Sequence, residues 1–442
     1  MFQTIANAWK VADLRKKMLY TCLIVLIFRI GSAIPVPFTN IGVEGIVDPS
    51  QGTFMNYLSM MTGDAFNYGT IFAMSITPYI NSSIIMQLLA VAIPALERLQ
   101  QEGEEGRKKI ASITRFVTIV LGLLQSTAYF FYLRSKNFVT PAGLTGFAAF
   151  FQAVTIIACF TAGTALIMWL GERINENGIG NGISIILFAG IVSRIPTLIT
   201  SLYGPKNGYI AHGGAYYVVT PLIGVMLILM IAYIVWMDNA DRRIPINYAK
   251  RVVGRKMYGG QNTHMPIKVN MSGVMPIIFA SSILSVPPTV QMFISADKIS
   301  NSKFLTGFFK LFTSDHWAYA IIYFVFIIAF AYFYASIQYN PIEMSKNIRE
   351  NGGSVPGIRP GEPTARYIGK IINRITLLGA LLLSIVALVP IIVSQIGKAT
   401  LPNGLNVSLG GTSIIILVGV ALETVKQLES QMMMRHYKGF LD

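Results

Sequence analysis

The sequence predicts an all-α membrane protein whose chain crosses the bilayer with ten transmembrane helices. Of its 442 residues, 53% are hydrophobic and only 12% are charged, which is typical of a polytopic membrane protein and not of a soluble one. The apolar residues also gather in runs of about the length that spans a hydrocarbon core. The ten runs lie at residues 18–36, 71–93, 116–133, 150–170, 183–202, 216–236, 271–293, 317–338, 371–394 and 412–428.

The first run is expected to remain in the protein as a membrane span. Residues 1–20, MFQTIANAWKVADLRKKMLY, contain no signal-peptide cleavage pattern before it. Within it, Arg29 is expected either to have a structural partner or to extend its side chain to the membrane interface. Cys22 and Cys159 both lie in apolar runs, so we interpret them as packing residues and not as a disulfide or metal pair.

The second run is unusually polar for a membrane span. Pro78 lies inside it and lacks a backbone donor, and Asn81, Ser82, Ser83 and Gln87 follow. Polar side chains in lipid tend to face protein or water. We therefore expect either a span with one face on lipid and another on a functional interior, or an ordinary bundle helix whose polar residues bond to its neighbours.

The distribution of Lys and Arg predicts that both termini are cytoplasmic. With the N-terminus placed inside, the inner segments hold 26 Lys and Arg and the outer segments hold eight. An excess of this kind orients membrane proteins with the basic side in the cytoplasm. The net charge of +15 is therefore mostly an orientation signal.

Two inner loops, residues 238–268 and 340–370, hold seven and five of these basic residues. Each loop is about 30 residues long, which exceeds an ordinary connection between helices and is typical of a binding loop. A cytoplasmic partner with an acidic surface, or one made of nucleic acid, would dock there. Any single charge is equally compatible with a solvated residue that only orients the chain.

The outer segment 37–70 contains no Lys or Arg, and residues 53–61, TFMNYLSMM, form a short apolar stretch within it. This stretch is too short to span the bilayer. We expect a re-entrant or interfacial helix that protein or water covers, with a surface helix on the outer leaflet as the alternative.

The sequence offers no catalytic motif of the HExxH, GxSxG or P-loop type, so we expect no catalytic centre, no metal and no cofactor. Two other classes of membrane protein would require ionisable or catalytic residues at membrane depth. A secondary transporter would need ionisable residues near the middle of the membrane, and an intramembrane enzyme would need a catalytic dyad or metal ligands there. The central portions of the second to tenth runs contain neither.

Seven long motifs carry a resemblance to a known family. They are PYINSSIIMQLL at 78–89, EGEEGRKKI at 102–110, MWLGERINENGIGNGISIILFAGIV at 168–192, RRIPINYAKR at 242–251, KVNMSGVMPIIFASSIL at 268–284, VPGIRPGEPTARYI at 355–368 and GGTSIIILV at 410–418. Together they resemble the SecY family of protein-conducting channels, and the similarity extends from residue 28 to the C-terminus.

The resemblance implies two inverted, pseudo-symmetric halves of five helices around a central pore. The halves are residues 1–205 and 206–442, with a hinge in the loop 203–215. It also implies the function of a preprotein translocase subunit, which passes unfolded secretory proteins across the membrane and releases transmembrane segments sideways into lipid. Its lateral gate opens between spans two and three on one side and seven and eight on the other. Such a channel is passive, and a partner ATPase, the ribosome or the membrane potential drives it.

The resemblance assigns a ring of apolar side chains to the narrowest point of the pore. A ring of bulky aliphatic residues gates by dewetting. Its first two pairs are each four residues apart, so each pair shares a helix face. Without the resemblance, these residues would be interpreted as core or lipid contacts. The ring residues are Ile76, Ile80, Ile183, Leu187, Ile278 and Ile416.

The resemblance also assigns residues 53–66 to a plug that closes the pore from outside. Asp64 stands where the family favours small uncharged residues, and Asn67–Tyr68 replace a more typical Ser–Arg, which leaves the detailed contacts open. The expected plug residues are Phe54, Met55, Tyr57, Leu58, Met60, Met61 and Asp64.

Polar residues of the second and seventh runs resemble the lining of the lateral gate. Polar pairs across helices in lipid contribute about 1 kcal/mol each, which would hold a gate shut but leave it openable. Ordinary helix packing is the alternative. The expected gate residues are Asn81, Gln87, Ser281, Ser282 and Val286.

Arg359, in GIRPG, matches the loop arginine with which the family engages its motor ATPase, SecA. A second docking set, shared by the motor and the ribosome, is Arg242, Arg243, Lys250, Arg251, Arg255, Lys256 and Lys268. The other implied partners are the small membrane subunits SecE and SecG, signal sequences, nascent membrane proteins and the lipid bilayer. The implied location is the bacterial plasma membrane.

Overall fold

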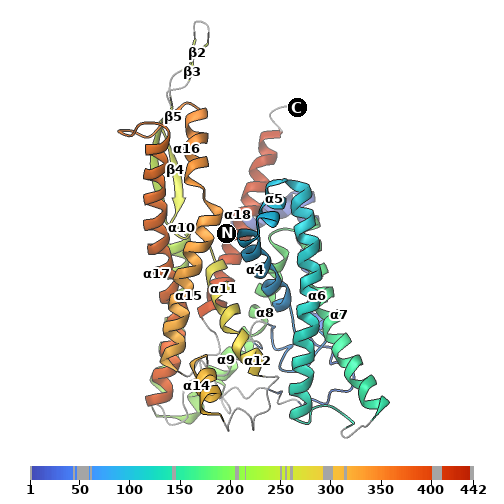
Figure 1. Cartoon of the computed structure of the whole chain (residues 1–442). Helices are drawn as coiled ribbons and strands as arrows, with labels where there is room; N and C mark the ends of the chain where they lie inside the picture. Colours follow the sequence, from blue (N-terminus) through green and yellow to red (C-terminus); the bar gives the residue numbers. More distant parts are fainter. Residues whose placement is uncertain are drawn as a thin grey trace.

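The computed structural model shows a mostly helical protein (Figure 1). It describes residues 2–42, 45–46, 59, 62–141, 146–204, 209–214, 216–248, 251–253, 256–258, 262–291, 302–312, 316–400 and 411–438. The helices are α1 (Phe2–Lys10), α2 (Ala12–Gly31), α4 (Thr77–Ala92), α5 (Pro94–Gln101), α6 (Glu104–Ser135), α7 (Phe147–Asn177), α8 (Gly182–Ser193), α9 (Ile195–Tyr203), η1 (Tyr209–His212), α10 (Tyr216–Asn239), α11 (Met275–Leu284), α12 (Val286–Gln291), α14 (Lys303–Leu311), α15 (Trp317–Gln338), α16 (Pro341–Glu350), α17 (Glu362–Thr400) and α18 (Gly411–Lys438). The strands are β1 (Asp241–Tyr248), β2 (Arg251–Val253), β3 (Lys256–Tyr258), β4 (Asn262–Lys268) and β5 (Gly353–Ser354).

Each of the ten predicted apolar runs contains helix. Among the described residues, seven helices are long and apolar enough to cross a membrane, and an eighth span results if the bent pair α4–α5 counts as one. These eight segments correspond to eight of the predicted runs. The remaining two runs contain α2, which is 20 residues long, and the short apolar helix Met275–Gln291, which comprises α11 and α12.

The helix of the second run starts later than its apolar sequence does. Pro78 lies in the first turn of α4 and not in its interior, so its missing N–H costs no helical hydrogen bond. Ser75, just before the helix, has a left-handed backbone with φ of 48°. The Ile80 amide still donates to the Ile76 carbonyl (3.0 Å), so these two residues stay one turn apart. At its other end α4 breaks at Ile93, and the chain bends by 106° into α5.

The two basic loops fold together into a small sheet, which corrects the prediction of an all-α protein. β1 lies in the middle of the order β4–β1–β5 and pairs antiparallel with both neighbours, while β2 and β3 form a separate hairpin. In RRIPINY, buried Ile244 and Ile246 alternate with exposed residues, which is the two-residue period of a half-buried strand. We call β1, β4, β5 and α16 the loop unit; Ile267, Ile348 and Ile368 also belong to its buried cluster.

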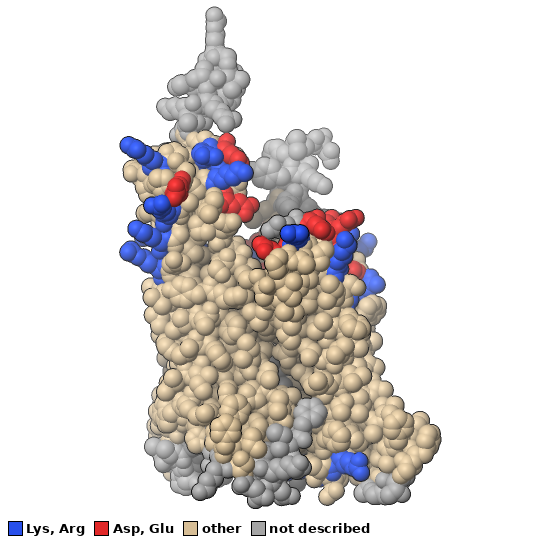
Figure 2. Space-filling view, viewed as in Figure 1, with Lys and Arg blue, Asp and Glu red and all other residues tan. Residues whose placement is uncertain are grey.

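Charged residues gather towards the ends of the molecule and leave an uncharged belt between them (Figure 2). Most of the visible Lys and Arg lie at the upper end, over α16, the start of α17 and the region of α5 and α6. This distribution agrees with the uneven Lys and Arg count of the sequence.

Candidate functional site

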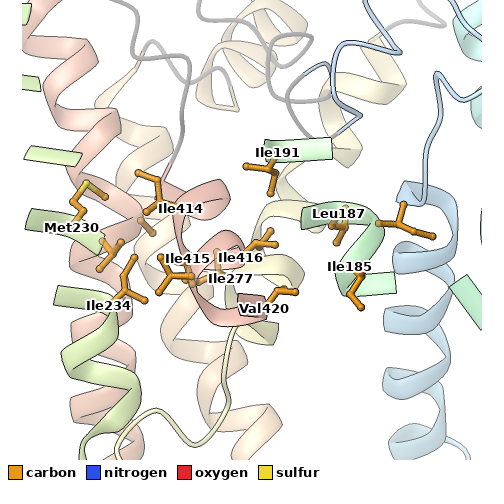
Figure 3. Packing of buried hydrophobic residues seen from close by; sticks show 14 of the residues in the cluster. Ile185, Leu187, Ile191, Met230, Ile234, Ile277, Ile414, Ile415, Ile416 and Val420 are labelled. Carbon is orange, nitrogen blue, oxygen red and sulfur yellow. The ribbon is translucent and has the colours of Figure 1, made fainter. Parts of the chain in front are cut away.

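The six predicted ring residues all belong to the largest hydrophobic cluster of the bundle or pack against it. Ile76, Leu187 and Ile416 are buried in it, with exposed fractions of 1%, 3% and 1%. Figure 3 shows Leu187 of α8 and Ile416 of α18 on facing sides of the space between these two helices. The other three ring residues are partly buried and pack against the same cluster; they are Ile80, Ile183 and Ile278.

Glycines allow α8 and α18, which carry predicted ring residues, to approach their neighbouring helices closely. A Cβ atom on Gly182, at the start of α8, would lie only 2.0 Å from the Gly171 carbonyl oxygen of α7. A Cβ atom on Gly411, at the start of α18, would lie 2.2 Å from the Val386 carbonyl oxygen of α17. Larger residues at these positions would push α8 and α18 away, so the glycines help to set where Leu187 and Ile416 lie.

The helices expected on the two sides of the lateral gate are in contact. α4 contacts α11, and α4 also packs against α6 while α11 packs against α15. The polar side chains bond within their own helices: Gln87 Nε2 donates to Ser83 Oγ (3.4 Å), and Ser281 Oγ donates to the Ile278 carbonyl (3.0 Å). Asn81 Oδ1 is buried without a partner. Among the described residues, no hydrogen bond joins α4 to α11, so apolar packing holds this contact.

Val286 does not continue the helix that carries Ser282. α11 ends at Leu284, and the Ser285 hydroxyl donates to the Ser282 carbonyl (2.6 Å) at the break. Val286 then begins α12 and is 52% exposed.

Asp64 is tied to the end of α8 that lies away from the loop unit. Its Oδ2 atom lies 3.1 Å from Nε of Arg194, and the two side chains are only 18% and 17% exposed. The Ser59 hydroxyl donates to Asp64 Oδ1 (2.8 Å). The unusual acid could be recognised in the sequence, but no local pattern indicated its basic partner Arg194, which lies 130 residues away. The other expected plug residues lie outside the described part of the chain: Phe54, Met55, Tyr57, Leu58, Met60 and Met61.

Arg29 has the structural partners that were one of its two expected roles. Its Nη1 atom donates to the Gly63 carbonyl (3.2 Å) and to Ser193 Oγ (3.3 Å). Gly63 has a positive φ of 63°, and a Cβ atom there would lie 3.0 Å from the Gly190 carbonyl oxygen of α8. The segment before α4 therefore lies directly on α8, and Arg29 of α2 joins it to the same helix end.

Three of the seven basic residues expected to dock partners lie exposed on the loop unit. Arg242, Arg243 and Lys268 are exposed on β1 and β4, and Arg243 Nε lies 3.1 Å from Asp241 Oδ2. Arg251 and Lys256 lie on β2 and β3, but their side chains are not among those described. The remaining two predicted residues, Lys250 and Arg255, lie outside the described part of the chain.

Arg359 lies on an exposed turn that side-chain hydrogen bonds hold in place. The Thr364 hydroxyl donates to the Arg359 carbonyl (2.8 Å), and the Ser345 hydroxyl of α16 donates to the Gly361 carbonyl (2.7 Å). Gly357 and Gly361 have positive φ values of 79° and 105°, which favour glycine. The turn is therefore fixed while the Arg359 side chain stays in solvent.

Comparisons with known proteins agree with this arrangement. The SecY family model matches residues 70–425. The protein translocase subunits SecY of Streptomyces galbus and Halalkalibacterium halodurans are 41% and 42% identical to this chain, each over 100% of both chains. A solved protein-conducting channel aligns with a TM-score of 0.61 at 18% identity, over 94% of this chain and 92% of its own. Sec61 in a canine ribosome–channel complex aligns with a TM-score of 0.58 at 18% identity, over the same shares of the two chains. Because the sequence similarity extends over the whole chain, this protein belongs to the SecY family.

Proposed function

We propose that this chain is the pore-forming subunit of a preprotein translocase, which passes unfolded secretory proteins across a membrane and releases transmembrane segments into lipid. The observation that carries the proposal is that the six predicted ring residues share one apolar cluster. They lie at the start of α4 and on α8, α11 and α18, which are far apart in sequence. A closed ring of aliphatic side chains keeps water out without binding any particular substrate chemistry.

The proposal includes ten spans in two halves, residues 1–205 and 206–442. By length and composition, up to eight segments of the described residues qualify as spans. α2 and Met275–Gln291 occupy the other two predicted runs, which supports a count of ten. The hinge would lie near η1, in the loop 203–215, part of which lies outside the described residues. The charge distribution of Figure 2 supports placing the loop unit and both termini in the cytoplasm, with the chain in a bacterial plasma membrane.

Closure from outside and sideways opening would use two further regions. The segment 62–70 lies on α8 through Gly63 and Asp64, a position from which the residues before it would cover the ring. The contact between α4 and α11 would be the lateral gate. Its lack of cross-helix hydrogen bonds in the described residues suits a contact that must open, since no buried polar pair has to be broken.

The loop unit would bind the partners that supply energy, because the chain would be a passive channel and not an enzyme. Its exposed basic residues, together with Arg359 on the neighbouring turn, suit a motor ATPase of the SecA kind and the phosphates of ribosomal RNA. Among the structural relatives, Sec61 is found in a ribosome–channel complex, which supports the second partner. Small subunits of the SecE and SecG kind would cover part of the lipid-facing surface.

The direct test is uptake of a purified precursor protein by vesicles that contain this chain with its small subunits. We expect uptake that requires the motor ATPase and ATP and that stops when the motor is omitted. Transport of a small solute coupled to an ion gradient, without precursor uptake, would instead support a secondary transporter. Proteolysis of a membrane substrate by the chain alone would support an intramembrane enzyme.

A further inference from the structure

Ser75, which directly precedes ring residue Ile76, has a backbone conformation that favours glycine. Its φ of 48° lies in the left-handed region, where a Cβ atom crowds the carbonyl oxygen that follows it. Among the described residues, three other non-glycine residues have a positive φ: Phe38, Asp64 and Asn137. None of these three adjoins a ring residue, so Ser75 is the position in this group where backbone strain borders the predicted constriction.

The side chain of Ser75 does not compensate for this conformation. A short polar residue in the left-handed region often gains a local hydrogen bond through its side chain. Ser75 is only 2% exposed, and within the described part of the chain its hydroxyl has no hydrogen-bond partner. Its amide alone is satisfied, by the Phe72 carbonyl (2.9 Å). The residue therefore carries two local costs, a strained backbone and an unpaired buried hydroxyl.

Packing on the N-terminal side of Ser75 holds the strained conformation in place. A Cβ atom on Gly163 of α7 would lie only 2.0 Å from the Ile71 carbonyl oxygen, so the chain lies directly on α7 there. A Cβ atom on Gly31 of α2 would lie 2.1 Å from the Phe72 ring. Strained residues persist only where their surroundings fix them in this way, and they are common at switch regions.

Packing on the C-terminal side of Ser75 involves the ring itself. Ile76 is 1% exposed in the large apolar cluster, and its carbonyl accepts from the Ile80 amide at the start of α4. Because Ile76 follows Ser75 directly, a return of Ser75 to a negative φ redirects the chain at Ile76. The strain at Ser75 and the position of Ile76 in the closed ring are therefore linked.

We propose that Ser75 sets how readily the ring opens, because its strain is present in the closed state and is released when Ile76 leaves the ring. The strain raises the free energy of the closed state alone, so it lowers the cost of opening. Ser75 is then a positioning residue that determines how strong a signal sequence must be to open the channel. The inference depends on the proposed function, in which the ring closes a pore.

The test is uptake of a precursor with a weakened signal sequence by vesicles that contain the full chain with its small subunits. Ser75→Gly should lower this uptake roughly fivefold, because glycine adopts a positive φ without strain. Uptake of the same precursor with a normal signal sequence should change little. Ser75→Thr keeps the hydroxyl but is β-branched and more strained at positive φ, so it should raise both the uptake and the ion leak.

Two further variants separate the backbone from other causes. Ser75→Ala removes the hydroxyl but keeps the Cβ atom, so its uptake should stay within about twofold of the wild type. Asn137→Gly is the matched control, since Asn137 has a φ of 59° on an exposed turn after α6, away from the ring. It should change neither the uptake nor the leak. Thermal unfolding of each variant checks that it remains folded.

Three results would overturn the proposal. Equal loss of uptake in Ser75→Ala and Ser75→Gly would assign the effect to the hydroxyl, and an equal loss in Asn137→Gly would assign it to general stabilisation. Unchanged ion leak in Ser75→Thr would mean that the backbone at this position does not act on the ring. The leak needs no precursor, so it decides this inference even if no vesicles take up precursor, a result that would contradict only the proposed function.

Discussion

The two ends of the bundle use charge in opposite ways. At the end away from the loop unit, Asp64 and Arg194 form an ion pair in which each side chain is less than one-fifth exposed, and Arg29 bonds to Gly63. At the loop-unit end, the ion pair of Arg243 with Asp241 is more open to solvent, with side chains that are 69% and 31% exposed.

The shielded charges stabilise one conformation, whereas the exposed charges remain accessible to a binding partner. A shielded ion pair with further hydrogen bonds favours one arrangement, and removing one member leaves the other uncompensated. Exposed pairs contribute little to stability because water and salt screen them. We therefore expect mutations at the first end to change how firmly the channel closes and mutations at the second end to change what it binds. Four experiments test this expectation.

Joining α4 to the segment formed by α11 and α12 should have the largest effect, because the predicted lateral gate lies between the two ends of the bundle. After replacement of Cys22 and Cys159, the changes Asn81→Cys and Val286→Cys should allow a disulfide if the Cα atoms come within about 7 Å. Oxidation should stop precursor uptake by vesicles almost completely, and reduction should restore it. A long flexible crosslinker should inhibit far less. Failure to crosslink, or uptake that continues with the bond formed, would argue against a gate at this contact.

Charge reversal at the loop-unit end should stop only motor-driven transport. Arg359→Glu should abolish motor-stimulated precursor uptake, because attraction to an acidic partner becomes repulsion, while ion leak stays unchanged. Uptake rate and motor binding are both measured in reconstituted vesicles. Arg349→Glu, an equal charge change on α16, is the control and should transport normally. A normal uptake rate with Arg359→Glu would show that the docking contact lies elsewhere.

A polar residue in the ring should loosen the seal without affecting docking. Ile416→Asn should raise ion leak several-fold and allow export of precursors with defective signal sequences, because a polar side chain stabilises water in a dewetting gate. Ion flux is measured in vesicles without the motor. Ile416→Leu keeps the apolar character and should leave the leak low. If Ile416→Asn also leaves the leak and the export stringency unchanged, Ile416 does not belong to the constriction.

Loss of the shielded ion pair should have the smallest of the four effects. Asp64→Asn should favour opening by about 0.5 kcal/mol, or roughly twofold, because a charge-assisted hydrogen bond to Arg194 is weakened but not lost. Ion leak measures this change. Glu350→Gln, which removes an exposed pair with Lys346 at the loop-unit end, should leave the leak unchanged. The double variant Asp64→Asn/Arg194→Gln should be no leakier than the single variant if the two residues act as a pair. Additive leaks would mean independent roles.

The sequence by itself determined the helical segments, the basic end and the family. These features are local: an apolar run of sufficient length must leave water, and clustered Lys and Arg identify one side of a membrane. The spacing of Ile76 and Ile80 likewise predicted a shared face, which the structure keeps through the hydrogen bond between them. Only the family resemblance, however, selected these isoleucines from the many others in the chain.

The tertiary structure decided which distant segments meet. β5 joins β1 across about a hundred residues, and a two-residue strand carries no sequence signal of its own. Asp64 forms an ion pair with Arg194, and Arg29 donates a hydrogen bond to the Gly63 carbonyl. Both interactions form because α2 and α8 contact each other and the segment before α4 lies on α8. Such contacts depend on chain geometry over long separations, whereas burial and charge can be recognised residue by residue.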